Sequence, residues 1–143
     1  MSKGLVAKSE ITINAPTSKV WEALTNPITV KQLMFGADVI TNWKEGSAIL
    51  YKGVWQGKPF EDKGKVVTFQ PEKLLVTTHW SPLSGTADIP ENYHTVSYEL
   101  SSENNLTHVV LTQDNNANDD EKKQSESNWA MMLGNLKKIV ESK

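Results

Sequence analysis

Aromatic side chains are the residues of this 143-residue sequence that are best suited to bind another molecule. Five tryptophans and three tyrosines occur in a chain that is otherwise of ordinary, rather polar composition. An indole N–H or a phenol hydroxyl adds a hydrogen-bonding tip to a large apolar surface, which suits an apolar pocket with few polar groups. A closely packed core uses the same residues, so the aromatic content alone leaves both interpretations open.

The polar residues contain no recognisable catalytic motif. The three histidines lie on different predicted strands without the close spacing of a metal site, and the chain has no cysteine. There is no G-x-S-x-G sequence, no Walker loop and no glycine-rich dinucleotide turn. The sequence therefore predicts no metal, no cofactor and no covalent catalysis.

Two weaker acid–base candidates remain. His94 follows a long loop that contains Asp88 and Glu91, and pairing with either carboxylate would make a general acid–base pair. We favour the interpretation that His94 is a surface or loop histidine. Either Glu61 or Asp62 has the parity to point inward from a predicted strand, but solvent-facing carboxylates are the favoured interpretation.

Charge and composition exclude several classes of partner. The formal net charge is -2, and all 15 basic residues are lysines that are scattered along the chain. Without arginine the chain cannot build bidentate forks onto guanine or phosphate, so we predict no nucleic-acid partner. No run of 18 apolar residues is present, so no membrane insertion is predicted. No apolar signal segment opens the chain, and we expect a cytoplasmic protein.

The hydrophobic pattern predicts one domain over residues 1–143. A strand at 6–13 precedes two short helices, at 17–25 and from Pro27 to about residue 34. Strand-like segments joined by short turns then follow, at 37–43, 47–55, 60–70, 74–80, 93–100 and 106–113. Consecutive strands with short connections favour an antiparallel meander.

The last predicted element is an amphipathic helix of about 20 residues that closes the chain. It follows a polar stretch at 114–127, which overlaps its acidic start, and lysines lie near its end, as the helix dipole favours. Gly134 within it indicates either close approach of another backbone or a locally softened helix. Its apolar positions recur every three or four residues, at Trp129, Met132, Leu133 and Leu136.

The order of the motifs resembles the START-like, or SRPBCC, helix-grip superfamily, the fold of the birch pollen allergen. Within it, the closest match is the branch named for activators of the heat-shock protein 90 ATPase. The similar segments are 13–16 with 20–27, 64–74, 77–80 and 129–136. The chain departs from the family pattern at Asn128, where a glycine is usual, and at Gln113, near where many members have a histidine.

The resemblance implies an α+β fold with the order β-α-α-β6-α. In it, a curved antiparallel sheet of about six or seven strands carries two short helices, and a long C-terminal helix lies across the sheet. A cavity between this sheet and the long helix is then expected. We predict that inward faces of three strands contribute to it, namely Tyr51, Gly53 and Trp55, then Val76, Thr78 and Trp80, then Val96, Tyr98 and Leu100. His79, of opposite parity to Trp80, is expected to point away from that face.

Our leading hypothesis is non-enzymatic binding of a small hydrophobic or amphipathic molecule in this cavity. One alternative is a co-chaperone-type interaction module with a heat-shock protein 90 partner, which rests on the branch name. The other is a cyclase- or aromatase-like enzyme, which requires an inward-facing His94 or Glu61. The predicted ligand-binding residues are Met34, Phe35, Trp43, Tyr51, Trp55, Phe69, Trp80, Tyr98, Trp129, Met132, Leu133 and Leu136.

Overall fold

The computed structural model describes residues 4–34 and 36–142, and within them it forms one sheet with three α-helices. The N-terminal elements are β1 (Leu5–Ile13), α1 (Thr17–Thr25), α2 (Pro27–Leu33), β2 (Asp38–Ile40) and β3 (Ala48–Trp55). The remaining strands and the last helix are β4 (Lys58–Gln70), β5 (Leu74–His79), β6 (His94–Glu103), β7 (Leu106–Asn116) and α3 (Asp119–Glu141). Two short 3-10 turns, η1 (Pro82–Ser84) and η2 (Pro90–Asn92), lie between β5 and β6.

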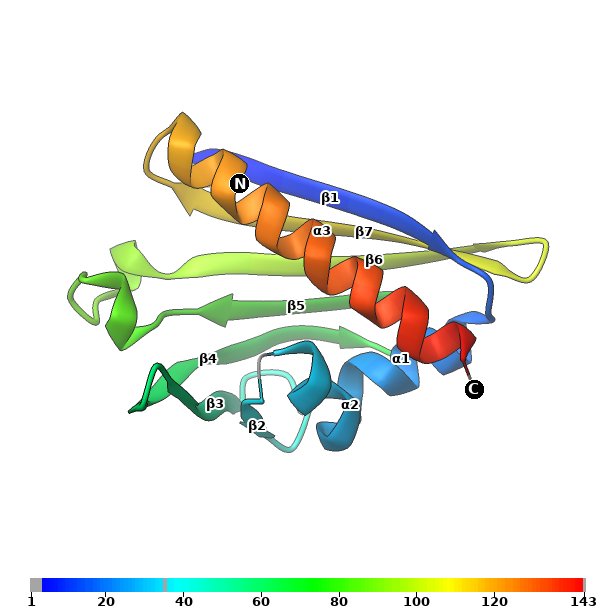
Figure 1. Ribbon diagram of the computed structural model, residues 1–143, viewed down its shortest axis with the longest axis horizontal. Helices are drawn as coiled ribbons and strands as arrows, with labels where there is room; N and C mark the ends of the chain where they lie inside the picture. Colours follow the sequence, from blue (N-terminus) through cyan, green and yellow to red (C-terminus); the bar gives the residue numbers. More distant parts are fainter. Residues whose placement is uncertain (1–3, 35, 143) are drawn as a thin grey trace.

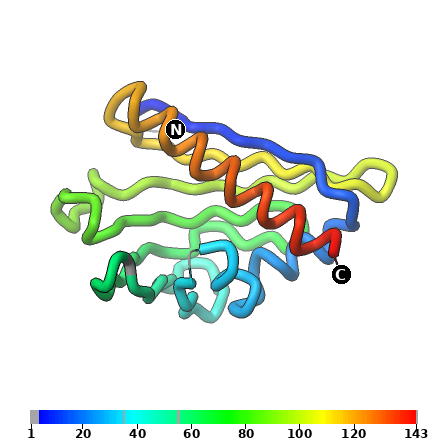
Figure 2. Tube along the Cα trace, viewed as in Figure 1, coloured from blue at the N-terminus to red at the C-terminus, as the bar shows by residue number. Residues whose placement is uncertain are grey.

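The strands form a single antiparallel sheet in the order β1-β7-β6-β5-β4-β3-β2. Helix α3 crosses one face of this sheet, starting beside β1 and ending near α1 (Figure 1). The loop after β5, in green, and the start of α3, in orange, lie at the end of the molecule opposite α1 (Figure 2). The predicted α+β arrangement is therefore confirmed, with seven strands in the described residues.

Local sequence explains the two short helices. Asn26 caps α2 by accepting a hydrogen bond from the backbone N–H of Ile28, and Pro27 occupies the first helical position. In α1 the apolar residues recur at helical spacing, and Val20 and Trp21 are both buried. Helices this short depend on burial of such a face for their stability.

Two predicted boundaries were wrong. The strand predicted at 37–43 is only three residues long, Asp38–Ile40. After it the chain turns, with the backbone N–H of Trp43 donating to Oγ1 of Thr41 and a φ of 61° at Trp43, so no extended strand continues to residue 43. The polar stretch 114–127 is mostly regular structure, since β7 continues to Asn116 and α3 starts at Asp119. At Gly134 an added Cβ meets no atom within 4 Å, so of the two interpretations offered for this glycine, close approach of another backbone is wrong.

The buried side chains form two clusters. The larger one joins α1 and α3 to β1, β5, β6 and β7, and the smaller one consists of Val30, Val39, Ile49 and Val66. Three partly buried side chains, Met34, Trp43 and Phe69, pack against both clusters.

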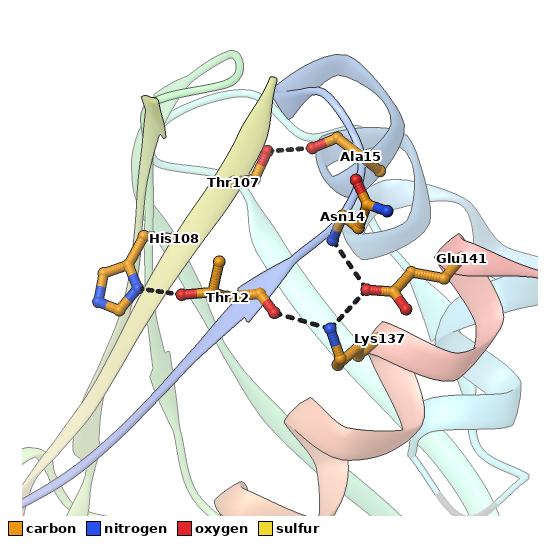
Figure 3. Close-up of polar contacts among 7 residues, drawn as sticks. All are labelled: Thr12, Asn14, Ala15, Thr107, His108, Lys137 and Glu141. Atoms are coloured by element: carbon orange, nitrogen blue, oxygen red, sulfur yellow. Dashed lines mark hydrogen bonds and ion pairs between the residues drawn. The ribbon is translucent and has the colours of Figure 1, made fainter. Parts of the chain in front are cut away.

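Polar contacts fasten the end of α3 to the end of β1 (Figure 3). The Nζ atom of Lys137 donates to the carbonyl of Thr12 at 2.9 Å and to Oε2 of Glu141 at 2.5 Å. The same Glu141 oxygen accepts from the backbone N–H of Asn14 at 2.8 Å. Because this oxygen holds both a lysine and a backbone N–H, the helix end is fixed at one point on the sheet.

Candidate functional site

A cavity of about 330 Å³ lies between the sheet and α3. One part of its wall is apolar and is formed by Leu33, Met34, Ala37, Phe60, Val96 and Met132. The rest is polar or aromatic and is formed by Tyr51, Asp62, Thr77, His79, His94, Tyr98, Gln113, Ser125, Asn128 and Trp129. The cavity thus combines a larger apolar surface with polar groups gathered on the sheet and at the start of α3.

Four of the polar side chains form a row across neighbouring strands. Tyr51 on β3 is the register partner of Asp62 on β4, and His79 on β5 is the register partner of His94 on β6. Opposite residues of an antiparallel pair point to the same face of a sheet. All four line the cavity, and Nε2 of His79 lies 2.9 Å from Oδ2 of Asp62.

A close approach of β4 to β5 brings this pair together. A Cβ added to Gly64 would lie 1.7 Å from the carbonyl oxygen of Thr78, so no larger residue fits there without a backbone shift. Beside it, the backbone N–H of Lys65 donates to Oγ1 of Thr78 instead of to a backbone carbonyl. The glycine thus permits the local contact that sets Asp62 beside His79.

The hydrogen bonds show which ring nitrogen of each cavity histidine carries a proton. Nδ1 of His94 lies 2.8 Å from the carbonyl oxygen of Asp114, which can only accept, so Nδ1 carries the proton. By the same reasoning Nε2 of His79 donates to the Asp62 carboxylate. The second ring nitrogen of each histidine makes no hydrogen bond to another described residue, and in the neutral ring it is an acceptor.

Only one of the two carboxylate oxygens of Asp62 has a hydrogen-bond partner among the described residues. Its side chain is 17% exposed, and Oδ2 is held by His79. The other oxygen, Oδ1, is buried and has no hydrogen-bond partner among the described residues. An unsatisfied buried acceptor costs about 1–3 kcal/mol, and groups of this kind are uncommon away from functional sites.

The two cavity tyrosines are held in the neutral form. Burial raises the pKa of Tyr51 well above its ordinary value, and the nearby Asp62 charge adds to this effect. Burial likewise raises the pKa of Tyr98, with a smaller contribution from Tyr51. Within the described residues neither hydroxyl has a hydrogen-bond partner, so each is a free donor and acceptor.

A polar network lines the cavity beside the N-terminal half of α3. The indole Nε1 of Trp129 donates to Oε1 of Gln113 at 2.6 Å. Gln113 in turn donates from Nε2 to Oγ of Ser125 at 3.4 Å, and Ser125 donates to Oδ1 of Asn116 at 3.0 Å. Gln113 thus orients the tryptophan on the cavity wall.

The structure brings together only part of the predicted ligand-binding set. Residues that line the cavity are Met34, Tyr51, Tyr98, Trp129 and Met132. Residues that pack in or against the core clusters, away from the cavity wall, are Trp43, Phe69, Leu133 and Leu136. Phe35 lies outside the described residues, and Trp55 ends β3 with its side chain outside the described part.

The placement of Trp80 in the cavity was wrong. On β5 the residues that line the cavity are Thr77 and His79, whereas Trp80 belongs to a second, open hollow beside β3 and β4. There its ring stacks on Tyr93 with centroids 6.4 Å apart, and its indole N–H donates to Thr86 at 3.1 Å. Both faces of this strand carry apolar residues, so the hydrophobic pattern did not show which face points inward.

The favoured interpretation of Asp62 as a solvent-facing charge was also wrong, while Glu61 is exposed as expected. The favoured interpretation of His94 as a surface histidine was wrong as well, because His94 lines the cavity. Its ring is hydrogen-bonded to the backbone carbonyl of Asp114 and not to a loop carboxylate. Of the loop carboxylates, Asp88 binds Lys63 instead. The signal that sequence reasoning missed was the pairing of Asp62 with Tyr51, because opposite residues of two antiparallel strands point to the same face of the sheet.

The described residues contain no group of three or more His, Cys, Asp or Glu side chains arranged to hold a metal ion. In the same part of the chain, every helix is too short or too polar to cross a membrane.

An antiparallel sheet that holds a long helix over a cavity is the helix-grip arrangement of the START-like, or SRPBCC, superfamily. Within this superfamily the chain belongs to the family described as activator of Hsp90 ATPase homolog 1-like protein, whose model matches residues 14–141.

Solved structures agree with this assignment. A Cytophaga hutchinsonii protein, ChR145, is similar with 48% identity and a TM-score of 0.87 over 99% of this chain and 97% of that one. The Aha1 dimer of Colwellia psychrerythraea has 24% identity and a TM-score of 0.72 over 95% and 96% of the two chains. Ara h 8.0201 has 14% identity and a TM-score of 0.76 over 97% and 99%, so the latter two show the fold alone. Among curated proteins, none matches the chain.

Proposed function

We propose that the protein binds a small, mostly apolar molecule in the cavity between its sheet and α3. The observation that carries this proposal is the cavity of about 330 Å³, whose wall joins an apolar surface to a short row of polar side chains. Ligand pockets in proteins have volumes of roughly 300–1,000 Å³ and show this combination of many apolar and few polar groups. Burial of the apolar body supplies affinity, and the polar row orients the molecule.

The row is pre-formed in a way that supports binding rather than simple packing. One oxygen of Asp62 is buried and has no hydrogen-bond partner among the described residues. In a core whose only role is stability, buried polar groups are normally satisfied by other protein groups. A bound molecule with a polar end supplies the missing hydrogen bonds.

Native mass spectrometry of the protein purified from its natural source tests the proposal. We expect a bound small molecule whose removal shifts the NMR signals of Met132 and Val96 on the cavity wall. Protein that is free of ligand when isolated, and whose cavity signals do not shift when compact hydrocarbons are added, would contradict the proposal.

A second candidate function is acid–base catalysis on the bound molecule, of the kind that cyclase-like enzymes perform. The supporting observation is the His79–Asp62 pair on the cavity wall, since a carboxylate that orients an imidazole is a common general-base arrangement. The test is hydrogen–deuterium exchange of the acidic C–H protons of a small cyclic ketone. Exchange should depend on the protein and be lost in His79→Gln but kept in His108→Gln, whose ring lies on the β1–β7 pair.

A third candidate is contact with a chaperone of the heat-shock protein 90 class, and its support is membership of the family named above. The test is the ATPase rate of the chaperone from the same organism, measured with and without this protein. An unchanged rate at saturating protein would argue against this candidate.

A further inference from the structure

Among the described residues, the wall of the cavity carries one carboxylate, several hydrogen-bond acceptors and two tyrosine hydroxyls, but no lysine or arginine. None of the residues that line it is a lysine, and the whole chain lacks arginine. In the part of the wall that the structure describes, the one carboxylate is that of Asp62, which His79 holds through one oxygen. An anionic group inside the cavity therefore meets a like charge and has no fixed cation as a partner.

Within the described residues, three of the four unpaired positions in the polar row are acceptors, and the fourth, the Tyr51 hydroxyl, both donates and accepts. Oδ1 of Asp62 has no partner in the described part of the chain. Nδ1 of His79 and Nε2 of His94 are the ring nitrogens left over after the other nitrogen has donated, so each offers a lone pair in the neutral ring. The terminal torsion of an aspartate is soft, so a small rotation turns its buried oxygen toward a donor in the cavity.

From this arrangement we infer that the ligand's head group is a hydrogen-bond donor, a hydroxyl or a protonated amine, and that carboxylates and phosphates are excluded. The inference rests on the proposed function, since it assigns the chemistry of the molecule bound in the same cavity. The apolar body lies against Leu33, Met34 and Met132, and the head group lies beside Asp62 and His79.

Three compact probes that share one hydrocarbon body test the inference. They are 1-adamantanemethylamine, 1-adamantanemethanol and 1-adamantanecarboxylate, and each is titrated into the full-length protein at about pH 8, above the range in which imidazoles usually titrate. Dissociation constants are taken from the NMR shifts of the Trp129 indole N–H and the Met132 methyl group, which both belong to cavity-lining residues. We expect the amine and the alcohol to bind at least about tenfold more tightly than the carboxylate.

The matched variants are Asp62→Asn and, as a control, Asp120→Asn on the exposed first turn of α3. Asp62→Asn preserves the shape but removes the charge and adds an N–H donor, so the preference over the carboxylate should fall by about tenfold or reverse. His79→Gln, which removes the ring acceptor, should weaken binding of the alcohol. Asp120→Asn should leave all three dissociation constants unchanged.

Equal or tighter binding of the carboxylate, or an unchanged preference in Asp62→Asn, would overturn the inference while leaving cavity binding itself intact. Failure of all three probes to bind would contradict the proposed function and the inference with it. The two failures are therefore separate results of one titration series.

Discussion

The imidazole of His79 donates from Nε2 to Oδ2 of Asp62 over 2.9 Å, and this bond joins β4 to β5 on the wall of the cavity between the sheet and α3. On one side of the pair stands Tyr51, the register partner of Asp62, and on the other stands His94, the register partner of His79. The polar face of the cavity is therefore built from one side chain on each of four neighbouring strands. Of the other residues that line the cavity, six are apolar and six are polar or aromatic. In the proposed function, the row orients the polar end of the bound molecule.

Filling the cavity should abolish binding without unfolding the protein. Ala37 is buried on the cavity wall, and Ala37→Leu adds three carbon atoms to a space that the ligand would occupy. We expect binding of 1-adamantanemethanol to weaken at least about tenfold, which corresponds to roughly 1.4 kcal/mol. Ala130→Leu on the exposed face of α3 is the matched control and should bind normally. Equal affinities of the two variants, measured by NMR titration, would place the binding site elsewhere.

Two glycine-to-alanine substitutions should have opposite effects on stability. Gly64→Ala places a methyl group against the carbonyl of Thr78 and forces β4 and β5 apart, so we expect destabilisation by about 1–3 kcal/mol or more. Gly134→Ala meets no atom within 4 Å in the middle of α3, and the better helix propensity should stabilise the protein by up to about 1 kcal/mol. Urea denaturation of both variants measures the difference. A tolerated Gly64→Ala would contradict the close approach that brings Asp62 to His79.

The buried tyrosines should make the protein less stable at alkaline pH. Burial raises the pKa of Tyr51 and Tyr98 in the folded state, whereas the phenols of the unfolded chain ionise near pH 10. Above about pH 10 the unfolded state loses protons that the folded state keeps, so the free energy of unfolding falls as pH rises. Urea midpoints measured between about pH 8 and pH 11 should show this fall, and Tyr51→Phe should reduce it. A flat wild-type profile would contradict the burial of these hydroxyls.

The end of α3 should weaken in acid. Hydrogen bonds from Lys137, and then from the Asn14 backbone, hold the pKa of Glu141 below its ordinary value. Stability from this contact is therefore complete above the ordinary glutamate pKa of about 4.3 and is lost as pH falls through the lower folded-state value. Glu141→Gln should lower the urea midpoint at neutral pH and reduce the acid dependence. Glu103→Gln, at the exposed tip of the β6–β7 hairpin, is the control, and identical acid profiles for the two variants would be the contrary result.

The fold could be predicted because its signals are local and repeated. Asn26 and Pro27 mark the start of α2, and the recurrence of Trp129, Met132 and Leu136 marks the buried stripe of α3. Short turns between strands led to the correct antiparallel order. The end of β2 was missed because a turn follows it, with a hydrogen bond from the Trp43 backbone to the Thr41 hydroxyl and a positive φ at Trp43, and tryptophan is not a residue that usually marks a turn.

The candidate site could be predicted only in part. The tyrosines and Trp129 are large enough to suggest a pocket, but a core and a pocket use the same residues. Asp62 was only a weaker candidate, and the expectation that His79 points away from the cavity was wrong, because strand periodicity gives two faces without saying which one is inward, and a shift of one residue exchanges them. Trp80 was misplaced for the same reason, since only the pairing of β4 with β5 sets its side chain outside.

The central claim is that the space between the sheet and α3 is a binding site for a small apolar molecule. The most direct measurement is the set of intermolecular NOEs between bound 1-adamantanemethanol and the methyl groups of the protein. The account predicts NOEs to Met34, Met132 and Val96 on the cavity wall, and none to Leu83, which is 54% exposed in the loop after β5. NOEs confined to exposed methyl groups such as those of Leu83, or no NOE at saturating probe, would contradict it.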